Sequence, residues 1–106
     1  YLLKEGYTIL AKNFRYQKAE IDIVAEKENV IASIEVKARS TDHFLLPQDA
    51  VTKSKMRLIV LATNHFLEKF NIQKEVRFDI ISILPNLEGN FTIKHLKNAF
   101  EAFDTN

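Results

Sequence analysis

The chain has 106 residues, 46% of them hydrophobic and 27% charged, which is enough for one domain with a modest core but not for two. It has no cysteine, so disulfides and thiolate metal sites are excluded, and any metal would be bound by oxygen or by the three histidines. The formal net charge of +1 argues against a protein that coats nucleic acid by bulk electrostatics. No hydrophobic run approaches the roughly 20 residues of a membrane-spanning helix, and no signal peptide opens the sequence. We therefore expect one cytoplasmic domain over residues 1–106, with no membrane contact.

The N-terminal part predicts a short helix followed by three strands. Residues 1–5 are typical of a helix end, and Gly6 would stop that helix because glycine adopts a left-handed backbone at little cost. Aromatic and branched residues then predict strands at 7–16, 19–26 and 29–38. The polar letters KEN separate the second strand from the third, so these two should form a hairpin.

The C-terminal part predicts a long helix, one buried strand and a small addition. Pro47 suits the first turn of a helix that runs to about residue 70. Helical spacing gives its expected buried stripe as Val51, Leu58, Ala62, Phe66 and Phe70. Residues 75–85 predict a central strand, residues 87–96 a turn and a short edge strand, and residues 97–103 a final helical turn. A helix crossover normally returns parallel, so we expect an α/β (α+β) chain with a mixed sheet.

Four charged side chains occupy alternate positions in the two strongest strands. Alternate residues of a strand share a face, so Glu20 and Asp22 share one face and Glu35 and Lys37 share another. The residues expected on the opposite faces are Ile21 and Ile23 in the first strand, and Val30, Ala32, Ile34 and Val36 in the second.

The hairpin register decides whether the two charged faces coincide. A two-residue loop at Glu28 and Asn29 places Asp22 opposite Glu35, whereas a loop one residue earlier places Glu20 opposite Glu35. Directly opposed side chains lie only about 5 Å apart at Cβ, and like charges there are destabilising. A divalent cation bound by carboxylate oxygens would offset the repulsion, and Mg²⁺ or Mn²⁺ prefers such ligands.

A solvated face is the alternative interpretation of the same charges. Lys37 would then form an ion pair with Glu35, and Glu20 would pair with Arg15 or Lys18 at the surface. Under the metal-site hypothesis, Lys37 would neutralise one carboxylate or orient a metal-bound water.

A basic segment follows the acidic cluster. Between Lys37 and Arg57 the sequence has five basic and two acidic residues. The basic residues are Lys37, Arg39, Lys53, Lys55 and Arg57. They would hold a polyanion at the rim of an acidic pocket, although the same count fits a helix surface that lysine and arginine merely solvate.

The motifs "GYTILAKNFR", "EIDIVA", "IEVKARS", "AVTKSK" and "RFDII" occur in this order over nearly the whole chain. Together they resemble the YraN-like family of uncharacterised proteins, which are predicted endonucleases of the PD-(D/E)XK superfamily related to archaeal Holliday junction resolvases. The resemblance implies a restriction-endonuclease-like core, in which helices flank a mixed sheet. Ala19 departs from the family pattern, which usually has glycine at that position.

The resemblance also implies site residues. The metal-binding aspartate of the superfamily falls on Asp22, its Glu-x-Lys motif on Glu35, Val36 and Lys37, and a further family acid on Glu20. The expected catalytic residues are therefore Asp22, Glu35, Lys37 and Glu20, of which Glu20 would assist a second metal or orient a ligand. Mg²⁺ or Mn²⁺ would be bound by the two motif carboxylates and the Val36 carbonyl. The residues expected to bind nucleic acid are Arg39, Lys53, Lys55 and Arg57. Arg77 and Asp79 match recurrent family positions to which no role is assigned, and a strand-end ion pair is their structural interpretation.

Three functional hypotheses follow. The first is a metal-dependent endonuclease that hydrolyses phosphodiester bonds in DNA, with branched or recombining DNA as the expected substrate. The second is a binding module that holds nucleic acid without cleaving it. The third is a protein-interaction domain in which the acidic pocket is vestigial. Because resolvase relatives act as symmetric dimers, the resemblance also implies a homodimer, without assigning its interface.

Overall fold

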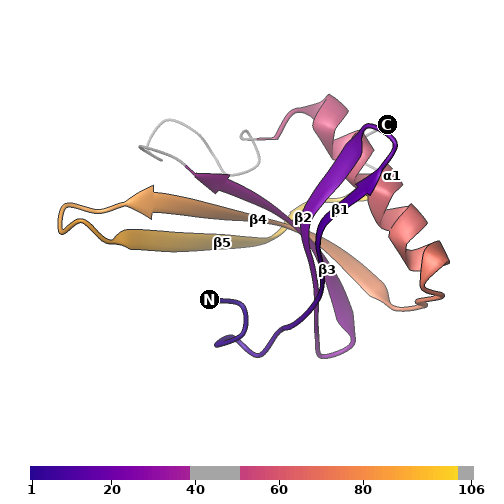
Figure 1. Cartoon of the computed structure of the whole chain (residues 1–106), viewed down its shortest axis with the longest axis horizontal. Coiled ribbons are helices and arrows are strands. Elements are labelled where there is room, and N and C mark those ends of the chain that lie inside the picture. The colour runs from indigo at the N-terminus through magenta and orange to yellow at the C-terminus, as the bar shows by residue number, and fades with distance from the viewer. Residues whose placement is uncertain (39–50, 103–106) are drawn as a thin grey trace.

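One mixed five-stranded sheet with a single helix on one face forms the computed structural model, which describes residues 1–38 and 51–102 (Figure 1). The strand order in the sheet is β1-β2-β3-β4-β5. In chain order the elements are β1 Thr8–Tyr16, β2 Ala19–Lys27, β3 Val30–Ala38, α1 Lys53–Lys69, β4 Glu75–Pro85 and β5 Phe91–Phe100. Among the described strands only β3 and β4, which lie on either side of α1 in sequence, pair in parallel, and this confirms the predicted mixed sheet.

Helix α1 begins at Lys53, later than the sequence predicts. Thr52 has an extended backbone, with φ −69° and ψ 159°, and its hydroxyl accepts a hydrogen bond from the Lys55 N–H at 3.1 Å. This threonine cap fixes the start of the helix, so Val51 lies outside it. Pro47, the predicted first-turn residue, lies outside the described residues. No helix in the described part of the chain is long and apolar enough to cross a membrane.

The buried stripe of α1 is rotated relative to the prediction. Its buried residues are Ile59, Ala62, Thr63 and Phe66. Leu58 and Phe70, which the spacing argument placed in the stripe, are 38% and 53% exposed. Phe70 lies beyond the helix as its C-cap residue, and the Thr63 hydroxyl contacts the Ser33 hydroxyl of β3 at 2.9 Å. The polar contact therefore turns a threonine, rather than Leu58, toward the sheet.

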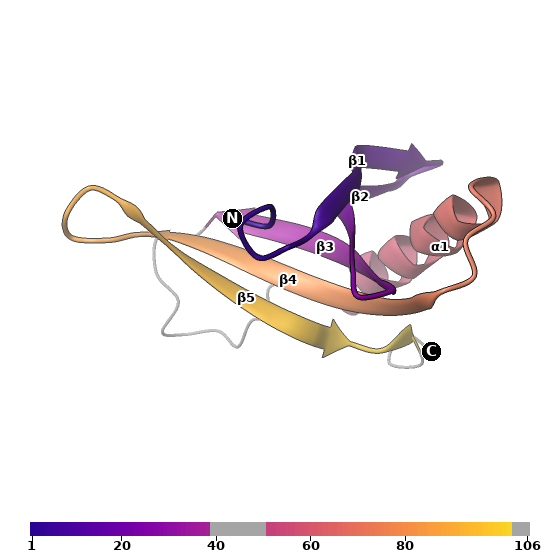
Figure 2. The same ribbon diagram turned by 90° about the horizontal axis from the view of Figure 1, so that it is seen from below.

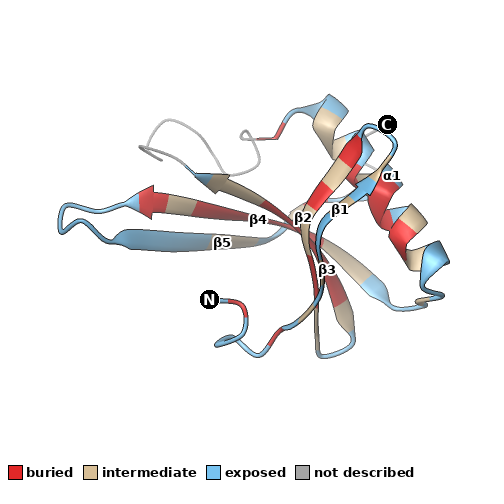
Figure 3. Ribbon diagram, in the orientation of Figure 1, coloured by how far each residue is buried: buried red, intermediate tan, exposed pale blue. Residues whose placement is uncertain are grey.

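The sheet is buried from both sides, as the red segments of β2, β3 and β4 show (Figure 3). On the α1 side, Ala62 and Phe66 pack against a cluster that includes Ile21, Val24 and Ile31. On the other side, the N-terminal residues Leu2 and Tyr7 cover Ala25, Ala32, Ile34 and Ile81. The central residues of β4, from Phe78 to Ser82, are all buried, which confirms a strand that is covered on both faces.

The two ends of the chain differ from the prediction in local structure. Residues 2–6 form turns rather than a helix, although Gly6 has the expected left-handed backbone, with φ +89°. Residues 97–100, predicted to be helical, belong to β5, because Phe100 pairs with Phe78 and their rings stack at 5.0 Å. The β4–β5 hairpin extends beyond the end of β3 as a projecting arm (Figure 2).

Candidate functional site

The β2–β3 hairpin has the register that places Asp22 and Glu35 at the same level. Lys27 pairs with Val30, so the loop consists of Glu28 and Asn29, whose φ values are +53° and +65°. Positive φ at both positions is the signature of the tight turn that suits a two-residue hairpin. The first of the two predicted registers is therefore confirmed and the second is wrong.

The ladder between β2 and β3 nevertheless ends before Asp22 reaches Glu35. Its last pair is Ile23 with Ile34, and the part of β2 before Ile23 pairs only with β1. Instead of a ladder bond, the Asp22 carboxylate Oδ2 accepts a hydrogen bond from the Val36 N–H at 2.8 Å. In a regular strand the N–H and C=O of one residue point to the same side, so strand geometry places the Val36 carbonyl on the β2 side of β3.

The strand is irregular at Asp22 itself. Ile21 packs in the cluster on the α1 side, whereas Ile23 packs in the cluster on the opposite side. The prediction that these two isoleucines share a face is therefore wrong. On the neighbouring strand β1, the residue at the same level is Asn13, which has φ +50° and is skipped by the ladder. Because of this irregularity, Ile21 and Ile23 each pack into a hydrophobic cluster, one on each side of the sheet. Asp22 lies at the point where the pairing of β2 with β3 ends.

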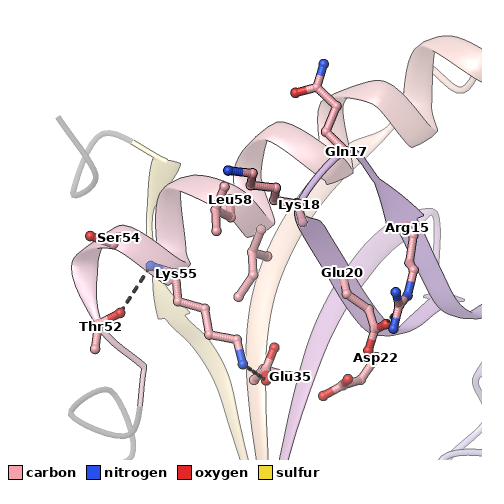
Figure 4. A pocket seen from close by; sticks show the side chains of 12 residues that line it. Arg15, Gln17, Lys18, Glu20, Asp22, Glu35, Thr52, Ser54, Lys55 and Leu58 are labelled. Carbon is pink, nitrogen blue, oxygen red and sulfur yellow. Dashed lines mark hydrogen bonds and ion pairs between the residues drawn. The ribbon is translucent and has the colours of Figure 1, made fainter.

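A cavity of about 530 Å³ opens between the β1–β2 turn, β3 and the start of α1 (Figure 4). Three carboxylates line it, those of Glu20, Asp22 and Glu35. Figure 4 shows the Asp22 side chain directed toward Glu35, with Lys55 reaching Glu35 from α1. Asp22 also lines a second concavity of about 470 Å³, together with residues of β1 and with Val36. The predicted acids therefore do come together at one cavity.

Glu35 is the buried centre of the site. It is 5% exposed, and its Oε1 lies 2.9 Å from Lys55 Nζ and 3.6 Å from Lys37 Nζ. The pKa of Lys55 lies above its ordinary value, chiefly because its ammonium donates to Glu35, and this effect outweighs the opposing effect of burial. The Lys37–Glu35 ion pair of the solvated-face interpretation thus exists, but it lies at a buried carboxylate.

Sequence reasoning placed Lys55 among the nucleic-acid contacts and missed its ion pair with Glu35. The signal was present in the helix: Lys55, Ile59, Ala62 and Phe66 recur at helical spacing, so the lysine extends the inward stripe by one turn. A charged residue at the end of a buried stripe indicates a buried partner, which here is Glu35.

Glu20 lies at the mouth of the cavity and already has a partner. Its Oε2 accepts from Arg15 Nε at 2.6 Å, and the two side chains are 36% and 78% exposed. Pairing with Arg15 is one of the two pairings that the solvated-face interpretation predicted. Glu20 is therefore less available than Asp22 as a ligand for a cation.

The basic residues around the cavity differ from the predicted set. Of the predicted residues, Lys55 lines the cavity, Lys53 and Arg57 are exposed residues of α1 that do not line it, and Arg39 lies outside the described residues. Arg15 and Lys18, from the β1–β2 hairpin, line the cavity instead. Their proximity depends on how the hairpin folds over the start of α1, which no local sequence pattern shows.

The donor set suits a small, hard cation. Among the described residues, no three His, Cys, Asp or Glu side chains are close enough together to hold a metal ion. Mg²⁺, however, is typically bound by one or two carboxylates and keeps several waters. Asp22 and Glu35, which line one cavity, and the carbonyl of Val36, whose N–H donates to Asp22, would hold it.

Comparison with known proteins places the chain in a family. The model of the uncharacterised protein family UPF0102 matches residues 1–83. The chain belongs to the UPF0102 family. A UPF0102 protein of Christiangramia forsetii is 46% identical over 103 residues, which cover 97% of this chain and 86% of that protein. UPF0102 proteins of Flavobacterium psychrophilum and Parabacteroides distasonis are 44% and 43% identical, covering 97% and 96% of this chain and 86% and 84% of the relatives. This is the YraN-like family that the motifs resemble.

Two residues of the RFDII segment of this UPF0102 protein, Arg77 and Asp79, form a second polar cluster on the face of the sheet opposite α1. Asp79, 1% exposed, accepts hydrogen bonds from Arg77 Nε at 2.8 Å, from His95 Nε2 at 2.7 Å and from the Asn98 N–H at 3.0 Å. Arg77 also donates to the Tyr7 hydroxyl at 2.6 Å. The predicted Arg77–Asp79 pair therefore exists, but it lies inside the sheet rather than at a strand end.

These contacts determine the ionisation of Asp79. Burial alone would raise the pKa of Asp79. The hydrogen bonds from His95, Arg77 and the Asn98 N–H outweigh burial and hold that pKa below its usual value. The cluster links the N-terminal turn, β4 and β5, and it contributes no side chain to the cavity.

Proposed function

We propose that this UPF0102 protein is a metal-dependent endonuclease of the PD-(D/E)XK superfamily that hydrolyses phosphodiester bonds in DNA, with branched or recombining DNA as its substrate. The observation that carries the proposal is the convergence of Asp22 and Glu35 on one cavity, with two lysines on the buried carboxylate. The order of three antiparallel strands, a helix and a parallel strand supports a restriction-endonuclease-like core.

The residues of the site would have distinct roles in this reaction. Asp22, Glu35 and the Val36 carbonyl would hold Mg²⁺ or Mn²⁺. A cation bound there would polarise the scissile phosphate and lower the pKa of a bound water. Lys37, tethered to the same strand as Glu35, would position the attacking water or stabilise developing negative charge. Glu20 would hold Arg15 at the cavity mouth through their ion pair.

Basic side chains would hold the DNA backbone beside the cavity. Arg15 and Lys18 lie on the hairpin side of the cavity and Lys55 on the helix side. Lys53 and Arg57 extend this basic surface along α1. Since the net charge of the chain is only +1, binding would depend on this local surface and weaken steeply with added salt.

The test compares three carboxamide variants of matched shape. Asp22→Asn and Glu35→Gln remove the charge of each proposed ligand but keep an acceptor oxygen, so the Val36 N–H keeps a partner. Glu26→Gln is the control, since Glu26 is also a β2 carboxylate paired with a lysine, Lys74, but it does not line the cavity. The measurements are calorimetric titration with Mn²⁺ and cleavage of linear and branched DNA.

We expect wild type and Glu26→Gln to bind Mn²⁺ and to cleave DNA only when metal is present. Asp22→Asn and Glu35→Gln should lose cleavage by on the order of 100-fold or more, because the cation would lose a ligand that stabilises the transition state. Circular dichroism should show that all four proteins are folded. Wild-type cleavage rates in both site variants would contradict the proposal.

A binding module without catalysis is the second candidate, and one observation favours it. Lys37 and Lys55 already neutralise Glu35, so the carboxylate is not left unpaired without a cation. DNA binding that persists in EDTA, with no cleavage in Mg²⁺ or Mn²⁺, would support this candidate. The homodimer expected from the resolvase relationship stays a prediction, and β5 is an edge strand at which pairing would be tested.

A further inference from the structure

We propose that Lys55 is a displaceable counter-ion of Glu35: it competes with the divalent cation for the Glu35 carboxylate, and cation binding releases its ammonium to contact a phosphate of the nucleic acid. This inference rests on the proposed function, since it assigns a role to Lys55 within the same site. It predicts an effect on metal affinity that can be measured without DNA and without cleavage.

The first argument is the crowding of one oxygen atom. Both ammonium groups approach the same atom of Glu35, Oε1, with Lys55 at 2.9 Å and Lys37 at 3.6 Å. A buried carboxylate without a partner is costly, so these contacts stabilise Glu35 while no cation is bound. A divalent cation bound at this carboxylate would face two positive charges within a few ångströms, so at least one ammonium must move away.

The second argument identifies which lysine moves. Lys37 is two residues from Glu35 on the same strand and its side chain is 28% exposed. Lys55 reaches Glu35 from a different element, and its side chain is 43% exposed while the carboxylate it contacts is 5% exposed. A long flexible side chain whose stem already lies at the surface can turn its ammonium into water at little cost. Lys55 is therefore the counter-ion that the cation would displace.

The third argument concerns the destination of the released ammonium. Lys55 lines the cavity, and the opposite wall carries Arg15 and Lys18. Once separated from Glu35, Lys55 would face the cavity from α1 and complete a positive rim on both sides. A phosphate that approaches the carboxylates would then meet a lysine that is unavailable while it neutralises Glu35. Metal binding and DNA binding would thereby be coupled through one side chain.

The experiment titrates Mn²⁺ into wild type, Lys55→Met, Lys55→Arg and Lys53→Met by calorimetry without DNA. Methionine keeps most of the length of the side chain and removes the charge, whereas arginine keeps the charge. Lys53→Met is the matched control, because Lys53 is an exposed lysine in the same helical turn that does not line the cavity. The rise in melting temperature caused by Mn²⁺ provides a second readout and shows that each variant is folded.

If Lys55 competes with the cation, Lys55→Met should bind Mn²⁺ roughly twofold to fivefold more tightly than wild type, the upper part of the range expected from loss of one partly exposed ion pair. Lys55→Arg should bind no more tightly than wild type, and Lys53→Met should bind equally. In Mn²⁺, but not in EDTA, Lys55→Met should bind DNA more weakly than wild type. Mn²⁺ binding that is detectable only for Lys55→Met, and not for the other three proteins, would also support the proposal.

Two results would overturn the inference, and they differ in what they say about the function. Mn²⁺ binding that Lys55→Met leaves unchanged or weakens would show that the lysine does not compete, while the endonuclease proposal would stand. Absence of Mn²⁺ binding from all four proteins would overturn both the inference and the proposed metal site.

Discussion

Asp22 and Asp79 each accept a backbone N–H at a place where a strand ladder is irregular. Asp22 accepts from Val36 just beyond the last β2–β3 pair, and Asp79 accepts from Asn98 at the register shift between β4 and β5. The two aspartates differ in their surroundings, and therefore in the roles that we assign to them. Asp22 lines the cavity, whereas Asp79 is buried among three donors on the opposite face.

Replacement of Asp79 by Asn should destabilise the protein in a pH-dependent way. At pH 7 we expect a loss of about 3 kcal/mol, because Arg77 would lose its buried charged partner. The folded pKa of Asp79 lies below its unfolded value, so its contribution is complete above about pH 4 and is lost as the pH falls through the folded pKa. Urea unfolding of wild type and Asp79→Asn at pH 7, 5 and 3 measures this difference. A difference that does not shrink on acidification would contradict the assignment.

The sequence identifies the acids of the site and their partners nearby in the chain, Lys37 for Glu35 and Arg15 for Glu20, but not the partner on α1. Asp22 and Glu35 emerge from strand alternation combined with the two-residue turn, which are local properties of the chain. The Lys55–Glu35 pair and the Arg15 and Lys18 side of the cavity join elements that are distant in sequence. Such contacts depend on how α1 and the β1–β2 hairpin pack, and no periodicity encodes that packing.

At the scale of elements, one buried polar contact fixes α1 on β3. Ser33 Oγ and Thr63 Oγ1 lie 2.9 Å apart, and both residues are 1% exposed. Thr63 also donates to the Ile59 carbonyl at 2.7 Å. Ser33 lies two residues before Glu35 on the same face of β3, so this contact helps to position the helix that carries Lys55.

Replacement of Thr63 by Val should destabilise the protein by about 1–3 kcal/mol, because the buried Ser33 hydroxyl would lose its partner. The double variant Ser33→Ala/Thr63→Val should be more stable than the sum of the two single losses predicts, since it leaves no unpaired hydroxyl on either element. Urea unfolding of the four proteins gives the coupling free energy. Additive losses would mean that the two hydroxyls do not interact.

In the type and extent of elements, the errors of the sequence prediction lie at the start of α1 and at the two ends of the chain. The five strands occur where runs of branched and aromatic residues predict them, and α1 occurs where helical spacing predicts it. Pro47 predicts an earlier start for the helix than the structure shows, because the start is set by the Thr52 cap. Residues 97–100 were predicted helical because the pattern gives no sign that Phe100 stacks on Phe78 of a distant strand.

At the scale of the whole molecule, the β4–β5 hairpin pairs with β3 along only part of its length in the described residues, 1–38 and 51–102. Ile83 is the last β4 residue that pairs with β3 in the described part of the chain, so among these residues the segment from Leu84 to Thr92 forms a two-stranded arm (Figure 1). At its tip, Leu87 and Phe91 are 106% and 70% exposed. An isolated two-stranded hairpin is only marginally stable in water.

Amide hydrogen exchange should therefore divide β4 into two parts. Peptides from the buried centre, Phe78–Ser82, should exchange at the slowest rates in the protein, because their opening requires disruption of both hydrophobic faces. Peptides from the arm should exchange by local fraying, at least about tenfold faster. Mass spectrometry of exchanged peptides measures both rates. Equal protection in the arm would indicate that another surface covers it in solution.

The two-residue turn at Glu28 and Asn29 limits how the family can vary in length. Asp22 lies six residues before the turn and Glu35 six residues after it, so the two acids meet only while both arms keep equal length. One residue inserted into either arm would send its side chains to the opposite face and separate the acids. Substitutions in this hairpin should therefore be tolerated more readily than insertions. The projecting β4–β5 turn carries no such constraint and is where insertions should accumulate.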